Sequence, residues 1–275
     1  MSGAGRSRWA AELDFAIRAA RDAGAIVMER YERLERIEAK GAKGSKDVVT
    51  EADHASEEAL IRAIRATFPG DAVFAEESGA HDGGEGSATG GRGRTWILDP
   101  VDGTVNYANG IPFFAVSVAL AVDGRPTVGV VLDPARDECF AAAVDGPATL
   151  NGREIGASPK ERLGDAVIAL GLSGRAVVAR TRAARKAVRV SRSMGSSALS
   201  LVYVANGRFD AFAQESGQSA WDVAAAGLIA ERAGATVTDF AGASWFEIAR
   251  RSGSWGVVGA GERIHAPLLE LVRPR

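Results

Sequence analysis

Two carboxylates that directly follow an apolar run have the types and spacing of a magnesium site. Asp99 and Asp102 stand three residues apart, immediately after the apolar residues 96–98. This run predicts a buried strand that ends in the two acidic residues. A tight turn after the strand could direct both carboxylates and the Val101 carbonyl into one small volume. Hard oxygen ligands of this kind suit Mg²⁺ or Mn²⁺ better than Zn²⁺, which prefers nitrogen and sulfur.

The residues around these carboxylates favour such a turn. Pro100 biases Asp99 towards extended geometry, and Gly103 can adopt the backbone angles that a turn demands. A short helix would then begin near Thr104, whose hydroxyl could join the same volume. The amide N–H groups of such a helix start would face a phosphate. The alternative is an ordinary surface turn, because Asp, Pro and Gly are common turn residues.

Three other acidic positions fall at predicted strand ends or helix starts. Asp53 lies where a helix begins and could cap it, Glu76 and Glu77 follow a short apolar strand, and Asp222 opens another helical segment. Each has an ordinary alternative, which is capping for the two aspartates and surface exposure for the two glutamates. Crowded carboxylates repel one another unless cations lie between them, so their convergence would indicate metal binding.

The composition excludes several classes of protein. The net charge of −2 argues against a nucleic-acid or membrane-surface partner attracted by bulk charge. Cys139 is the only cysteine, so neither an internal disulfide nor a thiolate cluster can form, and three scattered histidines do not indicate a zinc site. No signal-peptide core and no membrane-length apolar run are present, which favours a soluble cytoplasmic protein.

Hydrophobic periodicity and breaker residues predict alternating helices and strands without an internal repeat. Residues 40–46 form a basic loop and residues 78–93 a mobile loop. We expect helices over 9–38, 50–67, 104 onward, 176–187, 196–205, 222–234 and 263–272, and strands over 72–75, 96–98, 113–122, 127–132, 139–144, 166–170, 209–214, 235–239 and 256–259.

Four motifs in order, DVVTEAD, FAEESG, DPVDGTVN and AWDVAAAG, give the chain its resemblance to the inositol monophosphatase family of lithium-sensitive, magnesium-dependent phosphatases. The resemblance extends from Lys43 to about Asp239. It implies a layered αβαβα sandwich of the inositol monophosphatase and fructose-1,6-bisphosphatase type. Residues 1–146 would carry most metal ligands, and residues 147–275 would supply Asp222 and substrate contacts. The family commonly forms homodimers, so the resemblance implies one here.

The resemblance also implies a set of metal ligands. Glu76, Asp99 and the Val101 carbonyl would hold the first Mg²⁺, to which the attacking water binds. Asp99, Asp102 and Asp222 would hold the second, next to the leaving oxygen. A third, weaker ion could share Glu76.

Further residues match the family's catalytic and substrate positions. Asp53 and Thr104 resemble its water-orienting pair, and Glu76 would take part in catalysis through its ion. Among the substrate positions, Asp102, Gly103 and Thr104 would contact the phosphate, and Gly195, Ser196 and Ser197 would form a turn against the substrate. Glu215 would bind a substrate hydroxyl. Lys43 would lie in the mobile loop near the metals, and Glu77 would support the ligands without binding an ion.

The substrate is the least specified part of this prediction. Val105 and Asn106 stand where relatives that cleave nucleotide 3′-phosphates carry a lysine and an acidic residue, which favours a small polyol or sugar phosphate, with inositol 1-phosphate as the default. Histidinol phosphate, fructose 1,6-bisphosphate and 3′-phosphoadenosine 5′-phosphate are alternatives handled by relatives. A non-catalytic descendant that binds RNA polymerase or another partner is the alternative from a different class.

Overall fold

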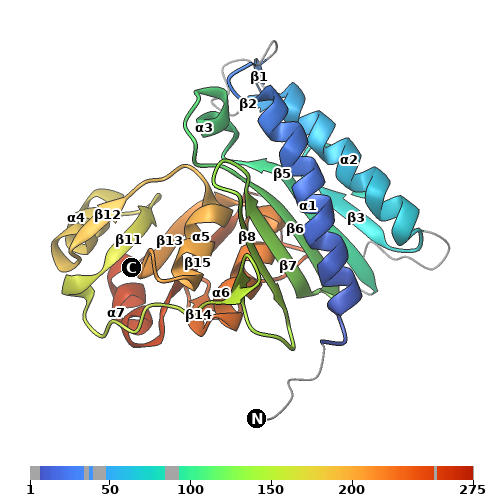
Figure 1. Ribbon diagram of the computed structural model, residues 1–275. Coiled ribbons are helices and arrows are strands. Elements are labelled where there is room, and N and C mark those ends of the chain that lie inside the picture. Colours follow the sequence, from blue (N-terminus) through green and yellow to red (C-terminus); the bar gives the residue numbers. More distant parts are fainter. Residues whose placement is uncertain (1–6, 34–36, 40–47, 84–92, 251–252, 275) are drawn as a thin grey trace.

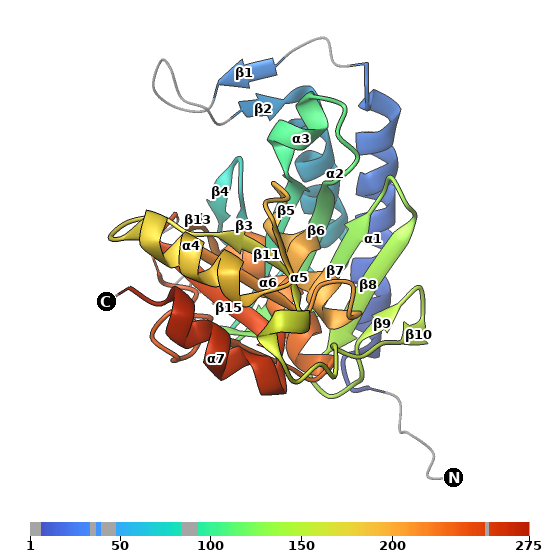
Figure 2. The same ribbon diagram turned by 90° about the vertical axis from the view of Figure 1, so that its left-hand side faces the viewer.

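The chain folds into five layers, in which helices and sheets alternate. The structure is a computed structural model that describes residues 7–33, 37–39, 48–83, 93–250 and 253–274. Helices α1 and α2 cover one face of a large sheet, α5 and α6 lie between that sheet and a smaller one, and α4 and α7 cover the outer face of the smaller sheet (Figures 1 and 2). The predicted αβαβα sandwich is confirmed.

The large sheet has eight strands in the order β10-β9-β8-β7-β6-β5-β3-β4. Its pairs are antiparallel except for β3 and β5, which run parallel. Residues of β6 are buried along almost the whole strand, because helices cover both faces of the sheet. The parallel pair matters for function, since the carboxyl ends of β3 and β5 lie side by side.

The smaller sheet has five strands in the order β12-β11-β13-β15-β14. Its inner face packs on α5 and α6, and that core is continuous with the large sheet. A separate apolar cluster joins its outer face to α4 and α7. Short strands β1 and β2 form a two-stranded ribbon near α3.

The element bounds differ from the prediction most clearly at the first helix. Helix α1 ends at Arg30 rather than at Glu38, because Tyr31 turns to extended geometry. The Tyr31 ring there packs 5.6 Å from the Tyr107 ring and 5.1 Å from the Phe114 ring, measured between centroids. Tertiary packing therefore outweighs the local helical period. The basic loop 40–46 and most of loop 78–93 lie outside the described residues.

The change from one sheet to the other falls between β10 and β11. Strand β9 pairs with β8 and β10 pairs with β9, so the large sheet extends past residue 146, while the division at that residue remains a prediction. None of the described helices is long and apolar enough to cross a bilayer. The elements are α1 (Ala10–Arg30), β1 (Ile37–Ala39), β2 (Val48–Thr50), α2 (Glu51–Thr67), β3 (Ala72–Ala75), β4 (Gly79–His81), β5 (Arg94–Asp102), α3 (Thr104–Ala108), β6 (Ala115–Val122), β7 (Arg125–Asp133), β8 (Glu138–Ala143), β9 (Thr149–Leu150), β10 (Arg153–Glu154), a 3₁₀ turn (Leu163–Asp165), β11 (Val167–Gly171), α4 (Val177–Ala187), β12 (Val190–Arg192), α5 (Ser197–Ala205), β13 (Ala211–Gln218), α6 (Ala220–Arg232), β14 (Ala235–Thr238), β15 (Trp255–Gly261) and α7 (Glu262–Val272).

Candidate active site

A bulge at the end of β5 brings its two carboxylates to the same side. Asp99 pairs with Ser117 and Asp102 with Ala115, so the three residue steps on β5 oppose only two on β6. In a regular strand, residues three apart point to opposite faces. The extra residue re-aims the chain, as bulges near functional sites commonly do. Asp99 also accepts a hydrogen bond of 3.1 Å from the Val101 amide, which fixes the turn.

Glycine is required at position 103, where β5 passes into α3. Gly103 has a φ of +97°, and a Cβ there would lie 3.1 Å from the Phe113 carbonyl oxygen and 3.1 Å from the Cβ of Ser196. Both the backbone angle and the tight contacts disfavour a side chain here, and glycine lets the turn approach the 195–196 segment closely. This contact joins the end of β5 to the start of α5.

Asp53 combines helix capping with a contact to the predicted site. It is fully buried at the third position of α2, where its carboxylate accepts from the Thr50 amide at 2.8 Å and from the Thr50 hydroxyl at 2.6 Å. Its other oxygen lies 3.2 Å from the Thr104 hydroxyl, which is also 2.9 Å from the Val101 carbonyl. The hydroxyl has one hydrogen, so these two acceptors are alternatives.

A buried glutamate that the sequence analysis missed holds the turn after β3. The Glu57 carboxylate accepts from the Glu77 amide at 2.8 Å and from the Ser78 amide at 2.9 Å. The Glu76 amide donates to the Leu98 carbonyl, which extends the pairing of β3 with β5 and sets Glu76 beside Asp99. Glu57 lies four residues after Asp53 on the buried face of α2, and an acidic residue on an apolar helix face was the available signal.

Asp222 reaches the site from α6, which lies across the large sheet. It occupies the third helical position and accepts from the Ser219 amide in a capping box. The helix approaches the sheet closely, since a Cβ at Gly129 of β7 would lie 2.9 Å from the Ala225 Cα. Ser117 on β6 donates to the Trp221 carbonyl at 3.2 Å, which aligns the helix start with the end of β5.

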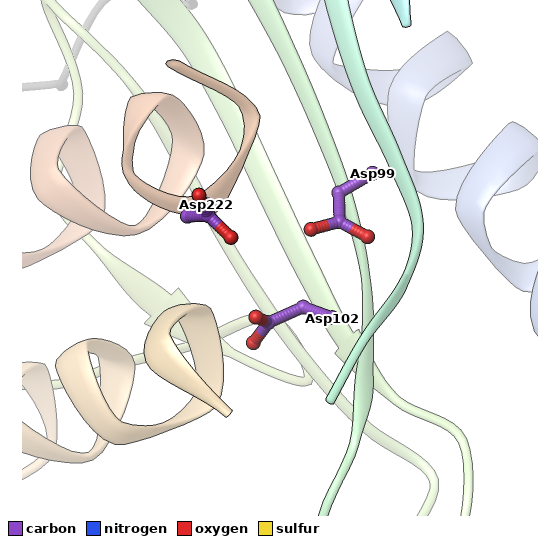
Figure 3. Close-up of side chains that lie close together, drawn as sticks. All are labelled: Asp99, Asp102 and Asp222. Atoms are coloured by element: carbon purple, nitrogen blue, oxygen red, sulfur yellow. The ribbon is translucent and has the colours of Figure 1, made fainter. Parts of the chain in front are cut away.

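These elements bring three carboxylates together. One oxygen from each of Asp99, Asp102 and Asp222 lies within 4.8 Å of the others, and Figure 3 shows the Asp222 carboxylate of α6 facing the two of β5. Burial raises the pKa of Asp99 well above its ordinary value, and the charges of Glu76, Asp102 and Asp222 and a hydrogen bond with Glu76 raise it further. The cluster is therefore electrostatically unfavourable without a compensating cation.

Asp102 also holds the start of α5. Burial raises its pKa to about 6, although hydrogen bonds from the Ser196 hydroxyl and from the Ser197 and Ala198 amides oppose the rise. The predicted glycine-and-serine turn thus contacts a predicted metal ligand directly. Asn106, a second residue that the sequence analysis did not assign to the site, donates to the Met194 carbonyl at 2.8 Å and steadies this turn.

A cleft of about 600 Å³ opens beside the carboxylates. Trp221, Val105 and Val48 add apolar surface to its wall. Predicted site residues supply much of the rest, namely Glu76, Glu77, Asp102, Gly103, Thr104, Gly195, Ser197 and Asp222. The cleft therefore combines carboxylates, which could hold cations, with some apolar surface.

The predicted substrate residue Glu215 does not line the cleft. The Glu215 carboxylate is 11% exposed and accepts from the Arg180 guanidinium at 2.8 Å and from the Ser173 amide at 2.7 Å. Arg180 itself is 7% exposed and also donates to the Val272 carbonyl. This buried ion pair links Glu215 on β13 to Arg180 on α4. Lys43 lies outside the described residues.

The donor set fits a hard divalent cation. The three clustered side chains offer only carboxylate oxygens, which are the preferred ligands of Mg²⁺ and Mn²⁺. Within the described part of the chain, no Arg or Lys forms an ion pair with Asp99 or Asp102. A cation between these oxygens would supply the positive charge that the surrounding side chains do not.

Comparisons with known proteins agree with this geometry. The family model described as "Inositol monophosphatase family" matches residues 9–274. The Nus factor SuhB of Pseudomonas aeruginosa is 39% identical over 250 residues, covering 85% of this chain and 87% of that protein. The crystal structure of the extragenic suppressor protein SuhB from Bartonella henselae superimposes with a TM-score of 0.86 at 31% identity, covering 96% of this chain and 98% of the other. The IMPase of Thermotoga maritima gives a TM-score of 0.83 at 32% identity, with 95% and 96% covered.

Proposed function

The chain belongs to the inositol monophosphatase family, and on this premise we propose that it hydrolyses the phosphate monoester of a small polyol or sugar in a magnesium-dependent reaction. Inositol 1-phosphate is the default substrate. The observation that carries the proposal is the meeting of Asp99, Asp102 and Asp222 beside a cleft that also exposes Glu76 and Thr104.

The protein residues divide into those that would hold cations and those that would orient reactants. Asp99, Asp102, Asp222, Glu76 and the Val101 carbonyl would hold two or three Mg²⁺ ions. Bound in this way, the ions would neutralise the phosphate, acidify an attacking water and stabilise the leaving oxygen. Monoester hydrolysis is among the slowest uncatalysed reactions, so the site must stabilise the charge of the transition state strongly. The positive charge of the bound ions would supply that stabilisation.

Thr104 and Asp53 would orient the attacking water. The Thr104 hydroxyl can donate its hydrogen to Asp53, at 3.2 Å, and then accept a hydrogen bond from water. The competing acceptor is the Val101 carbonyl, which is also a proposed cation ligand. The pair would contribute by positioning the water.

The phosphate would lie against the turn at Gly103 and Thr104, and the rest of the substrate towards Gly195 and Ser197. Val105 and Trp221 on the rim support an uncharged ring rather than a second phosphate. Histidinol phosphate, fructose 1,6-bisphosphate and 3′-phosphoadenosine 5′-phosphate remain the alternative substrates for the same chemistry. Glu215 would bind a substrate hydroxyl only if its pairing with Arg180 left an oxygen directed at the cleft.

A partner-binding role is the second candidate, and the names of the relatives favour it. The Pseudomonas aeruginosa and Pasteurella multocida relatives, 39% and 37% identical, are both named Nus factor SuhB. We propose such a role in addition to hydrolysis, with RNA polymerase as one possible partner, because the carboxylates needed for catalysis are all present. We further propose a cytoplasmic location and a homodimer.

A phosphate-release assay tests hydrolysis and substrate together. Inositol 1-phosphate and the three alternatives are compared by kcat/KM, with Mg²⁺ present and with EDTA. The proposal expects Mg²⁺-dependent release that falls by roughly 10³-fold or more in Asp99→Asn. Asp22→Asn, an exposed change on α1, is the matched control and should keep full activity. Full activity in Asp99→Asn, or no release from any ester, would reject the proposal.

A further inference from the structure

One long segment of the chain carries only positive charge. Between Asp165 and Asp210 there is no Asp or Glu, although the whole chain has nearly equal numbers of acidic and basic residues. The segment runs from β11 through α4 and β12 to the end of α5. Its basic residues are Arg175, Arg180, Arg182, Arg185, Lys186, Arg189, Arg192 and Arg208. The remainder of the chain therefore carries the balancing negative excess.

Six of these cations are exposed on α4, on β12 and beside them, and we call them the basic face: Arg175, Arg182, Arg185, Lys186, Arg189 and Arg192. Positions 182, 185 and 186 follow the spacing of one side of α4, and Arg189 lies two residues after the helix ends at Ala187. Strand β12 is an edge strand of the smaller sheet, and α4 lies beside it on the side of the molecule away from α1 and α2 (Figure 1). These six cations thus lie on neighbouring elements at one outer edge of the molecule.

The basic face is poorly neutralised by the protein itself. Among the described residues, its one ion pair is between Arg189 and Asp165, at 3.1 Å, and both side chains are well exposed. Arg180 is the contrasting case, since it is buried and paired with Glu215. An exposed Arg192 can be explained as protection of an edge strand. That explanation does not apply to the cations of α4.

From these observations we infer that the basic face binds the phosphate backbone of a nucleic acid. Arginine dominates the face, and its planar guanidinium matches phosphate geometry. The α4 helix is about 16 Å long, over which a duplex presents on the order of ten phosphate charges. Ala176, Ala179 and Ala183 line the surface between the cations, so a backbone can approach without obstruction. No aromatic side chain lies between Arg175 and Arg192, which excludes base stacking by this segment.

Other occupants fit the same surface less well. A two-fold contact between copies of this face would set cations against cations, at a cost in free energy. Basic surfaces that bind bilayers carry large apolar groups, whereas Val178, 79% exposed, is the one large apolar side chain that this face exposes in the described segment. A tight protein interface needs a buried apolar or aromatic centre, which is also missing here.

The test measures binding of the full chain to a mixed-sequence RNA duplex of about 20 base pairs. Fluorescence anisotropy reports the affinity at KCl concentrations from about 50 to 200 mM. We expect the logarithm of affinity to fall linearly with the logarithm of salt concentration. The triple variant Arg182→Gln, Arg185→Gln, Lys186→Gln should bind on the order of 10²-fold more weakly at the low-salt end, and its slope should be smaller by about 2.7.

Controls separate this role from general charge effects and from catalysis. The triple variant Arg18→Gln, Arg125→Gln, Arg153→Gln removes equal charge from exposed positions elsewhere and should bind like the wild type. Arg182→Lys with Arg185→Lys should keep most of the slope. Both the kcat and the KM for phosphate esters should be unchanged in the first triple variant, because its residues lie outside the cleft.

Several results would overturn the inference. They are no duplex binding at the lowest salt, equal weakening in the two triple variants, equal affinity for polyglutamate of the same charge, and binding confined to vesicles of anionic lipid. A raised KM for phosphate esters without duplex binding would also overturn it, because the cations would then attract the small substrate.

Discussion

Replacing Asp99 by asparagine should make the metal-free protein more stable while removing its response to magnesium. Asp99 is 1% exposed and faces Glu76, Asp102 and Asp222. Asparagine keeps the shape and can still accept from the Val101 amide, as Asp99 does at 3.1 Å. It removes one charge from a group of mutually repelling carboxylates, so the free energy of unfolding should rise.

The size of the effect follows from the spacing of the charges. Two full charges separated by 4.8 Å, the limit within the cluster, repel by about 3.5 kcal/mol at an effective dielectric constant of about 20. Partial protonation at neutral pH relieves some of this energy. We therefore expect a gain of about 1 to 3 kcal/mol, which corresponds to roughly 2 to 6 °C in Tm for a chain of this size.

The assay is thermal unfolding in EDTA and in saturating MgCl₂. The wild type should gain stability from Mg²⁺, because a cation that binds only the folded state shifts the equilibrium by mass action. Asp99→Asn should start from a higher Tm in EDTA and gain little from Mg²⁺. Asp22→Asn on the exposed side of α1 should change neither quantity.

The gain should also depend on pH with a definite sign. The pKa of Asp102 is raised from 3.8 to about 6, which means that the folded state favours the protonated carboxyl. The resulting stabilisation is complete below about pH 4 and is lost as the pH rises through 6. The loss amounts to about 3 kcal/mol. Most of this loss comes from burial of the Asp102 carboxylate. Because Asp102 carries its full charge at about pH 8, repulsion between the carboxylates is also largest there, and Asp99→Asn should stabilise most. A lower Tm for Asp99→Asn in EDTA at that pH, or an undiminished Mg²⁺ response, would refute this reasoning.

Two further predictions concern proton competition and the turn after β3. Mg²⁺ affinity should fall about tenfold per pH unit below pH 6, where Asp102 takes up a proton, and calorimetry in two buffers should detect proton release on binding. An affinity unchanged between about pH 5 and pH 8 would contradict this. Glu57→Gln should lower stability by about 1 to 3 kcal/mol in thermal melts, because one of the two amides that donate to the buried Glu57 carboxylate loses its acceptor, and should weaken Mg²⁺ binding about tenfold by misplacing Glu76. Glu58→Gln, at an exposed neighbouring position on α2, is the control. Equal effects of the two changes would argue against the role of Glu57 in holding the turn after β3.

Local signals were sufficient for the elements that carry the site. The apolar run 96–98 predicted the centre of β5, and the helix predicted over 50–67 matches α2, which spans Glu51–Thr67. Breakers and periodicity also located α5 and α6 to within a few residues. These features succeed because capping, turn formation and burial depend on residues that are near one another in the sequence.

Features that depend on distant partners could not be read in this way. The bulge between Asp99 and Asp102 exists only in the register with β6. Glu57 acts on amides twenty residues away, and Asn106 on a carbonyl 88 residues away. Tyr31 leaves the helical pattern to pack on Tyr107 and Phe114, contacts that no local window contains.

The total charge of the chain also conceals a feature of one segment. The balance of 33 basic and 35 acidic residues argued against a nucleic-acid partner. That total averages over the acid-free segment between Asp165 and Asp210, in which the charge is entirely positive. A whole-chain sum therefore describes solubility better than it describes a particular surface.

The position of α6 between the two sheets has a consequence for synthesis on the ribosome. The large sheet can form as soon as β10 has emerged, but its inner apolar face stays uncovered until α5 and α6 follow. Asp222 arrives with that cover, so the full set of carboxylates is assembled in the same event that shields the core. An incomplete chain consequently has no complete ion site with which to sequester magnesium, and it is at this stage that chaperones would have most to protect.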